Sequence, residues 1–138
     1  MIKHKTTIRV RYAETDQMGY VHHSHYALYL EEARMKLLQI QGIDLAQLER
    51  EGIIMPVAEM RTRYSIPLRF GDTITVETEI LPLVKSSLEF HYRIYNQDKK
   101  LVSRSRTTLV FADKESGKLL SNPQEYLGSL SPYMQQSI

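Results

Sequence analysis

The sequence contains no cysteine and no tryptophan among its 138 residues. The absence of cysteine excludes a disulfide framework, a thiol nucleophile and a thiolate metal site. No run of apolar residues approaches the roughly 20 that a membrane-spanning helix needs, and the basic, alternating first ten residues lack the apolar core of a signal peptide. We therefore expect a cytoplasmic protein without stable membrane insertion.

The chain also has no large excess of positive or negative charge. The 18 Lys and Arg residues and 16 Asp and Glu residues leave a net charge of +2, and the two signs are interleaved along the chain. A nucleic-acid-binding protein usually shows a clustered basic segment, so we expect no nucleic-acid partner. The hydrophobic content of 42% is typical of a globular protein, and the length predicts a single domain over residues 1–138.

The hydrophobic period changes along the chain and predicts the order of its elements. A helical period follows Ser24, the expected N-cap, and ends near Gly42, while a short helix is expected between Asp44 and Glu51. A further short helix is expected after Asn122. Period-two alternation predicts strands over residues 6–12, 56–68, 73–81, 87–95 and 101–111.

This order, one strand, a long helix and four strands with short connections, favours an antiparallel meander in an α+β fold. The long helix must bury its apolar stripe. A curved five-stranded antiparallel sheet wrapped around that helix buries it most simply. The stripe consists of Tyr26, Leu30, Ala33, Leu37 and Ile40, widened by Tyr29 and Met35.

The junction between the first strand and the long helix carries the candidate chemistry. Asp16 lies there, with Glu14 as a rival carboxylate, next to backbone N–H groups that a helix start leaves free. A base or nucleophile beside oxyanion donors is what hydrolysis of an activated acyl group requires. An aspartate at such a junction also serves as a turn former, and type and position alone leave both roles open.

His22, His23 and His25 are candidate metal ligands by residue type, but adjacent histidines at a helix start point in different directions. We therefore expect no metal and no cofactor. The tyrosines nearby, Tyr12, Tyr20, Tyr26 and Tyr29, fit either a core or the lining of an acyl pocket.

The junction resembles a known active-site segment. The pattern Tyr12-x-Glu14-Thr15-Asp16-x-x-Gly19-x-Val21-x-His23-x-x-Tyr26, followed by Tyr29 and Glu32-Ala33-Arg34, is similar to that of hotdog-fold acyl-CoA thioesterases. The resemblance is to the 4-hydroxybenzoyl-CoA thioesterase-like branch, in particular the Tol–Pal-associated group. It extends to Pro56-Val57, Tyr64 with Pro67, Gly71-Asp72 and Val76-Glu77-Thr78.

The resemblance implies a hotdog fold and metal-free hydrolysis of a short or medium aliphatic, or aromatic, acyl-CoA. Asp16 would be the nucleophile or general base, Tyr12 and His23 would position it, and a homodimer or homotetramer would hold the sites at its interface. The implied oxyanion donors are the backbone N–H groups of Val21, His22 and His23. The remaining implied contacts are an acyl pocket of Tyr20, Tyr26, Tyr29 and Met60, and coenzyme A contacts at Lys85, Arg104 and Arg106.

Two departures from the family pattern concern the pocket entrance and the first acid. Glu14 stands where the family often has Asp, and Tyr20 and His22 occupy positions that are usually aliphatic and aromatic. Two other functions stay open at this point: a hotdog hydroxyacyl-thioester dehydratase, and a non-catalytic acyl-CoA binding module. The thiol carrier, coenzyme A or an acyl carrier protein, is also open.

Overall fold

Alternating apolar residues place three neighbouring strands with one face in the core. The computed structural model describes residues 2–81 and 86–121. On β4 and β5 the residues Ile74, Val76, Phe90 and Ile94 are almost fully buried, and the side chains between them face outward. The strands are β1 (Ile2–Arg9), β3 (Val57–Tyr64), β4 (Thr73–Ile80), β5 (Ser87–Tyr95) and β6 (Leu101–Val110).

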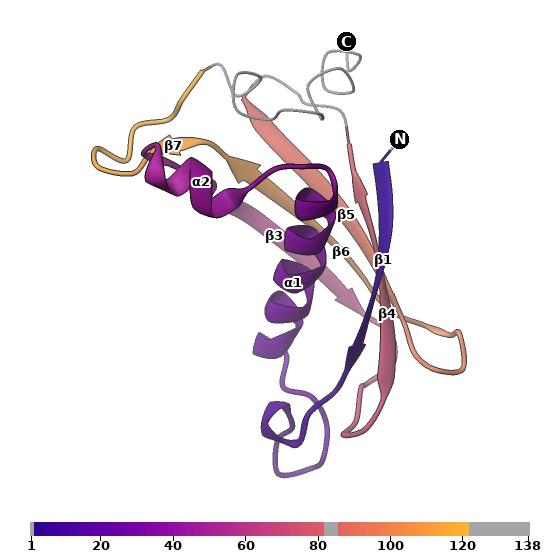
Figure 1. Ribbon diagram of the computed structural model, residues 1–138. Helices are drawn as coiled ribbons and strands as arrows, with labels where there is room; N and C mark the ends of the chain where they lie inside the picture. Colours follow the sequence, from indigo (N-terminus) through magenta and orange to yellow (C-terminus); the bar gives the residue numbers. More distant parts are fainter. Residues whose placement is uncertain (1, 82–85, 122–138) are drawn as a thin grey trace.

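These strands form one antiparallel sheet in the order β1-β4-β5-β6-β3, and helix α1 (Ser24–Ile40) lies across one face of it (Figure 1). The helix packs most closely on β1 and β4. The predicted hotdog architecture, a five-stranded antiparallel sheet around one long helix, is confirmed.

The strand order corrects one expectation. The meander holds for β4, β5 and β6, including the hairpin turn at 96–99, where Lys99 has a positive φ of 61°. However, β3 does not pair with β4, its successor in the chain. It pairs with β6 at the opposite edge, while β1 pairs with β4.

The first and last residues of two strands, β1 and β3, differ from the bounds that the sequence predicted, which were 6–12 and 56–68. β1 begins at Ile2 and ends at Arg9, and the chain then turns through the short 3₁₀ helix η1 (Tyr12–Glu14). β3 ends at Tyr64, so residues 65–68 are loop. Helix α2 (Leu45–Arg50) has the predicted Asp44 cap, and β2 (Ile53–Ile54) pairs with β7 (Ala112–Asp113) in a second sheet that was not predicted. The helix expected after Asn122 lies outside the described residues.

The predicted buried stripe of α1 is correct near its start and wrong near its end. Tyr26, Leu30, Ala33 and Leu37 are buried, but Ile40 is 62% exposed and Met35 46% exposed. The helix faces the sheet with Leu38 and the side chain of Arg34 in their place. The buried Arg34 guanidinium donates to the Tyr92 hydroxyl at 3.5 Å and lies 3.9 Å from the Glu31 carboxylate, so its charge has a partner.

Strand β3 is exposed over nearly its whole length, although β6 pairs with one of its edges. Val57, Met60 and Tyr64 are each about half exposed, and the other edge of β3 carries no partner strand among the described residues. An open sheet edge with apolar side chains is a surface that proteins usually cover. Across the described part of the chain, no helix is both long and apolar enough to span a membrane.

Candidate active site

A buried carboxylate fixes the turn that leads into α1. Glu14 is only 5% exposed and accepts hydrogen bonds from the Arg11 backbone N–H (2.9 Å), the Arg11 guanidinium (3.0 and 3.2 Å) and the Tyr29 hydroxyl (2.8 Å). Its backbone carbonyl accepts the His22 N–H at 3.1 Å. One residue therefore ties the end of β1, the middle of α1 and the start of α1 together.

This arrangement changes the acidity of both partners. Burial alone would raise the pKa of Glu14, but the hydrogen bonds from Arg11 and Tyr29, with the Arg11 charge, hold that pKa below its ordinary value. Burial raises the pKa of Tyr29, and the neighbouring Glu14 carboxylate raises it further. Glu14 is consequently an ionised, fully engaged carboxylate, which removes it as the rival base.

Asp16 lies two residues further on, in an exposed loop that Glu14 closes. Its Oδ1 accepts the backbone N–H groups of Met18 (2.9 Å) and Tyr20 (3.1 Å), while its own N–H donates to the Tyr20 carbonyl at 2.7 Å. Gly19 completes this turn with φ +83°, which a residue with a Cβ rarely adopts. Asp16 is thus a turn former through Oδ1, and Oδ2 is not engaged by any described residue.

The predicted oxyanion donors are reduced to one. The Val21 N–H donates to the Leu68 carbonyl at 2.8 Å and the His22 N–H donates to the Glu14 carbonyl at 3.1 Å, so the prediction that these two groups are free is wrong. A loop that must be anchored uses its own amides for that purpose. The His23 N–H has no acceptor among the described residues, and it precedes the first turn of α1 directly.

The cap of α1 also differs from the expectation for Ser24. The helix begins at Ser24, with His23 as N-cap residue, and the Ser24 N–H donates to His22 Nδ1 at 3.2 Å. The His22 ring lies 4.1 Å from the His23 ring, centroid to centroid. The imidazole of His22 thus replaces the serine hydroxyl as the cap.

His23 and Tyr26 meet the loop after β3 at a hollow of about 270 Å³, here called the His23 hollow. Tyr26 packs edge-on against Tyr64 at 4.9 Å. Tyr64 and the loop after it were not predicted as lining residues, although the resemblance had included Tyr64 and Pro67. The hollow is lined by Val21, His23, Tyr26, Tyr64, Ser65, Ile66 and Pro67.

Within one chain the predicted acyl pocket is not assembled, because only Tyr26 of its four residues lines the His23 hollow. Tyr29 is buried and bonded to Glu14. The Tyr20 ring lies under the Arg69 guanidinium at 5.0 Å, and its hydroxyl accepts from Arg69 at 3.0 Å. Met60 is half exposed on β3.

Tyr12 does not reach Asp16 in this chain. It is 76% exposed, and its ring packs edge-on against Phe70 at 5.7 Å. Together with Met18, which is 79% exposed, these rings form an uncovered apolar group beside the Asp16 loop. An exposed group of this kind indicates a contact surface.

The predicted coenzyme A contacts lie on the other side of the sheet. Arg104 and Arg106 alternate with the buried Ser105 and Thr107 on β6, so they project from the face turned away from α1. Lys85 lies outside the described residues. Searching the described residues for three or more His, Cys, Asp or Glu side chains able to share a metal ion gives no such group.

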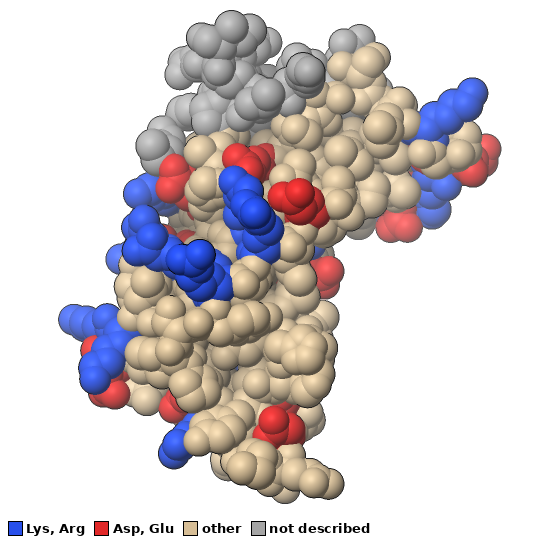
Figure 2. All heavy atoms as spheres, turned by 180° about the vertical axis from the view of Figure 1, so that it is seen from behind, with Lys and Arg blue, Asp and Glu red and all other residues tan. Residues whose placement is uncertain are grey.

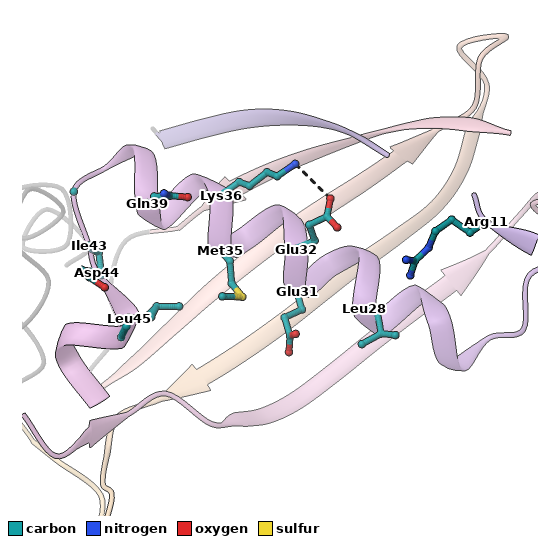
Figure 3. A pocket seen from close by; sticks show the side chains of 12 residues that line it. Arg11, Leu28, Glu31, Glu32, Met35, Lys36, Gln39, Ile43, Asp44 and Leu45 are labelled. Carbon is teal, nitrogen blue, oxygen red and sulfur yellow. Dashed lines mark ion pairs between the residues drawn. The ribbon is translucent and has the colours of Figure 1, made fainter. Parts of the chain in front are cut away.

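Another hollow, of about 820 Å³, lies along the outer surface of α1 towards residues 42–46 (Figure 3). Leu28 and Met35 form its apolar part, and Glu32 pairs with Lys36 at 3.4 Å on its rim. None of the predicted catalytic or pocket residues lines it, so its size does not make it the candidate active site.

The family model of the thioesterase-like superfamily matches residues 10–130. The chain belongs to this superfamily. Similar proteins include YneP of Bacillus subtilis, 36% identical over 114 residues that cover 83% of each chain. The acyl-CoA thioester hydrolase YbgC of Escherichia coli is 31% identical over 106 residues, which cover 77% of this chain and 79% of YbgC.

Solved structures agree with the fold of this thioesterase-like chain. A DHNA-CoA thioesterase of Staphylococcus aureus superposes with a TM-score of 0.90 at 27% identity, over 96% of this chain and 91% of that one. A Thermus thermophilus protein superposes with a TM-score of 0.84 at 36% identity, over 94% and 98% of the two chains.

We expect Glu14→Gln to lower the free energy of unfolding by about 2 kcal/mol at pH 7, because charged hydrogen bonds to a buried acceptor are lost. The lowered pKa of the folded state means that this contribution is present above the ordinary value of 4.5 and is lost as the pH falls through the folded pKa. Denaturant unfolding from pH 7 to pH 3 should show the gap between variant and wild type closing below pH 4.5.

Glu32→Gln is the matched control. Its partner Lys36 and Glu32 itself are both about half exposed, so this loss should stay below about 0.5 kcal/mol. Equal losses in the two variants, or a Glu14→Gln gap that does not depend on pH, would contradict the role given to Glu14.

Proposed function

We propose that this protein hydrolyses acyl-CoA thioesters, with Asp16 as the reacting carboxylate. The observation that carries the proposal is the Asp16 loop: one carboxylate oxygen is held by two backbone N–H groups and the other is unengaged, next to the start of α1. The family membership and the activity in the name of YbgC support the same reaction.

The chemistry needs no group beyond the substrate and water. Asp16 Oδ2 either attacks the thioester carbonyl carbon, giving a mixed anhydride that water then cleaves, or removes a proton from a water that attacks that carbon. In both cases the C–S bond breaks, the thiol of coenzyme A leaves with a proton, and the acid is released. The His23 N–H, at the positive end of α1, stabilises the oxyanion.

The acyl group is proposed to occupy the His23 hollow. Its volume of about 270 Å³ and its tyrosine rings suit a short or medium aliphatic acyl chain or an aromatic acyl group. His23 lines this hollow beside the Asp16 loop, so its side chain positions the substrate.

A second copy of the chain is proposed to complete the site. Within the described ranges one edge of β3 has no partner strand, Met60 and Tyr64 on its inner face are half exposed, and Tyr12 and Phe70 are exposed as well. A two-fold homodimer through β3 covers all of these groups and closes the open hollow, and a pair of such dimers forms a tetramer. Met60 would then contribute to the pocket from the interface.

Asp16→Asn should lower kcat by at least about 100-fold, while KM changes little, because the amide keeps the turn through Oδ1 but supplies neither nucleophile nor base. Thiol release from a short-chain acyl-CoA measures both constants. Asp98→Asn, in the β5–β6 turn, is the control and should match wild type. Near-normal turnover by the Asp16 variant would refute the assignment.

Sedimentation at micromolar concentration should give a mass at least twice the 16.1 kDa of one chain. Met60→Asp, which places a charge on the exposed inner face of β3, should shift the protein towards monomer and lower its turnover. Leu119→Asp, at a residue that is 67% exposed outside the sheet, should do neither. A fully active monomer would contradict the proposed interface.

Along a saturated acyl-CoA series, kcat/KM should rise about fourfold per methylene while the hollow fills, since each buried CH₂ contributes roughly 0.8 kcal/mol. It should then level off or fall at medium chain length. A value that still rises at a 16-carbon chain would show an open tunnel in place of the His23 hollow.

A further inference from the structure

The outer face of the sheet, turned away from α1, carries arginines on three adjacent strands. Arg63 on β3 lies opposite Arg104 on β6, and Arg104 lies opposite Arg93 on β5. In the neighbouring row, Arg61 lies opposite Arg106. We name these five residues the arginine face. They are spread over 46 positions of the sequence (61 to 106), so only the strand pairing brings them together.

Among the residues that the structure describes, only one of these five charges has an ion-pair partner. Like charges directly opposite each other destabilise a sheet, and here the register contains three such pairs. Arg106 has an ion pair with Glu89 at 3.6 Å. For the other four arginines, no carboxylate in the described part of the chain lies within ion-pair distance, although Glu77 is the cross-strand partner of Arg93.

The surface beneath these side chains is hollowed. One hollow of about 360 Å³ lies between β3 and β6 and is lined by Arg61, Arg63, Arg104 and Arg106. A second hollow of about 160 Å³ shares Arg104 and Ser105 with the first and is also lined by Arg93 and His91, and by the carboxylates Glu77 and Glu79 of β4. Seen from behind the sheet, Lys and Arg side chains gather over this face (Figure 2).

The spacing suits an anion with several charges. Paired strands lie about 4.8 Å apart and alternate residues about 6.8 Å apart along a strand, so the guanidinium groups can contact adjacent phosphates together. The planar, forked guanidinium matches phosphate oxygens in pairs. The two arginine rows contain no Phe or Tyr on which bases would stack, which disfavours single-stranded nucleic acid.

We propose that the arginine face binds a ligand that carries two or more linked phosphate groups. Two sources supply this chemistry: a free polyphosphate or nucleotide, and the phosphates of coenzyme A itself. The second source rests on the proposed function, and the first does not.

Titration calorimetry of the wild-type protein with inorganic tripolyphosphate tests the proposal without any assay of activity. Binding should be detectable at micromolar to millimolar concentration, and it should weaken as salt is raised. Arg63→Gln/Arg104→Gln should weaken it at least tenfold, because it removes the cross-strand pair at the centre of the arginine face, of which Arg104 lines both hollows. Arg9→Gln/Arg50→Gln, which removes the same charge elsewhere, should leave the affinity within about twofold of wild type.

Three further measurements sharpen the result. A rise in KM for acyl-CoA in Arg63→Gln/Arg104→Gln, without a change in kcat, assigns the phosphates to coenzyme A, and an unchanged KM assigns them to a free ligand. Equal affinity for hexaglutamate would show a surface without phosphate preference and overturn the proposal. Aggregation of the variant with unaltered tripolyphosphate affinity would also overturn it, since the arginines would then only keep the outer sheet face soluble.

Discussion

Glu14 joins three segments that must be fixed before any catalytic geometry can exist. Its carboxylate accepts hydrogen bonds from Arg11, just after β1, and from Tyr29 on α1, and its carbonyl accepts the N–H of His22, just before the helix. The loop that contains Asp16 connects Glu14 to His22 and is therefore fixed at both ends. A carboxylate with this many donors is stable only when ionised, which explains both its lowered pKa and its unsuitability as a base.

The anchoring of the loop has a chemical consequence. The amides of Val21 and His22 attach the loop to Leu68 and Glu14, so the proposed mechanism assigns the oxyanion to the His23 N–H. One copy of the chain leaves Tyr12, Met60 and Tyr64 exposed, and the proposed acyl pocket beside Tyr64 is therefore open. In the described part of the chain the outer edge of β3 also has no partner strand, and the proposed homodimer would cover both this edge and the pocket.

Local patterns predicted most of the fold. The alternation in β4 and β5 identified their buried faces correctly, since such strands have one face in the core, and the resemblance implied the overall architecture. The position of β3 was missed because short connections favour neighbouring strands, whereas β3 pairs with β6 across the sheet. Ile40 was misassigned because periodicity does not show where the sheet beneath the helix ends.

The candidate site was predictable in type but not in detail. The motif contains His23 and Tyr26, which line one hollow in the fold, yet it did not show which amides the tertiary contacts would occupy. Tyr29 belongs to the Glu14 anchor, and its sequence position is equally compatible with a pocket. The arginine face depends on the pairing of strands that are far apart in the sequence, and the sequence pattern does not show that pairing.

The central claim is hydrolysis of a coenzyme A thioester, and it is tested most directly by following free thiol release with the wild-type protein. A panel of saturated, hydroxylated and aromatic acyl-CoA substrates, without added metal or cofactor, covers the proposed range. The account predicts stoichiometric release of thiol and free acid from at least one of them. Loss of water from a 3-hydroxyacyl-CoA without thiol release, or tight binding without turnover of any substrate, would contradict it.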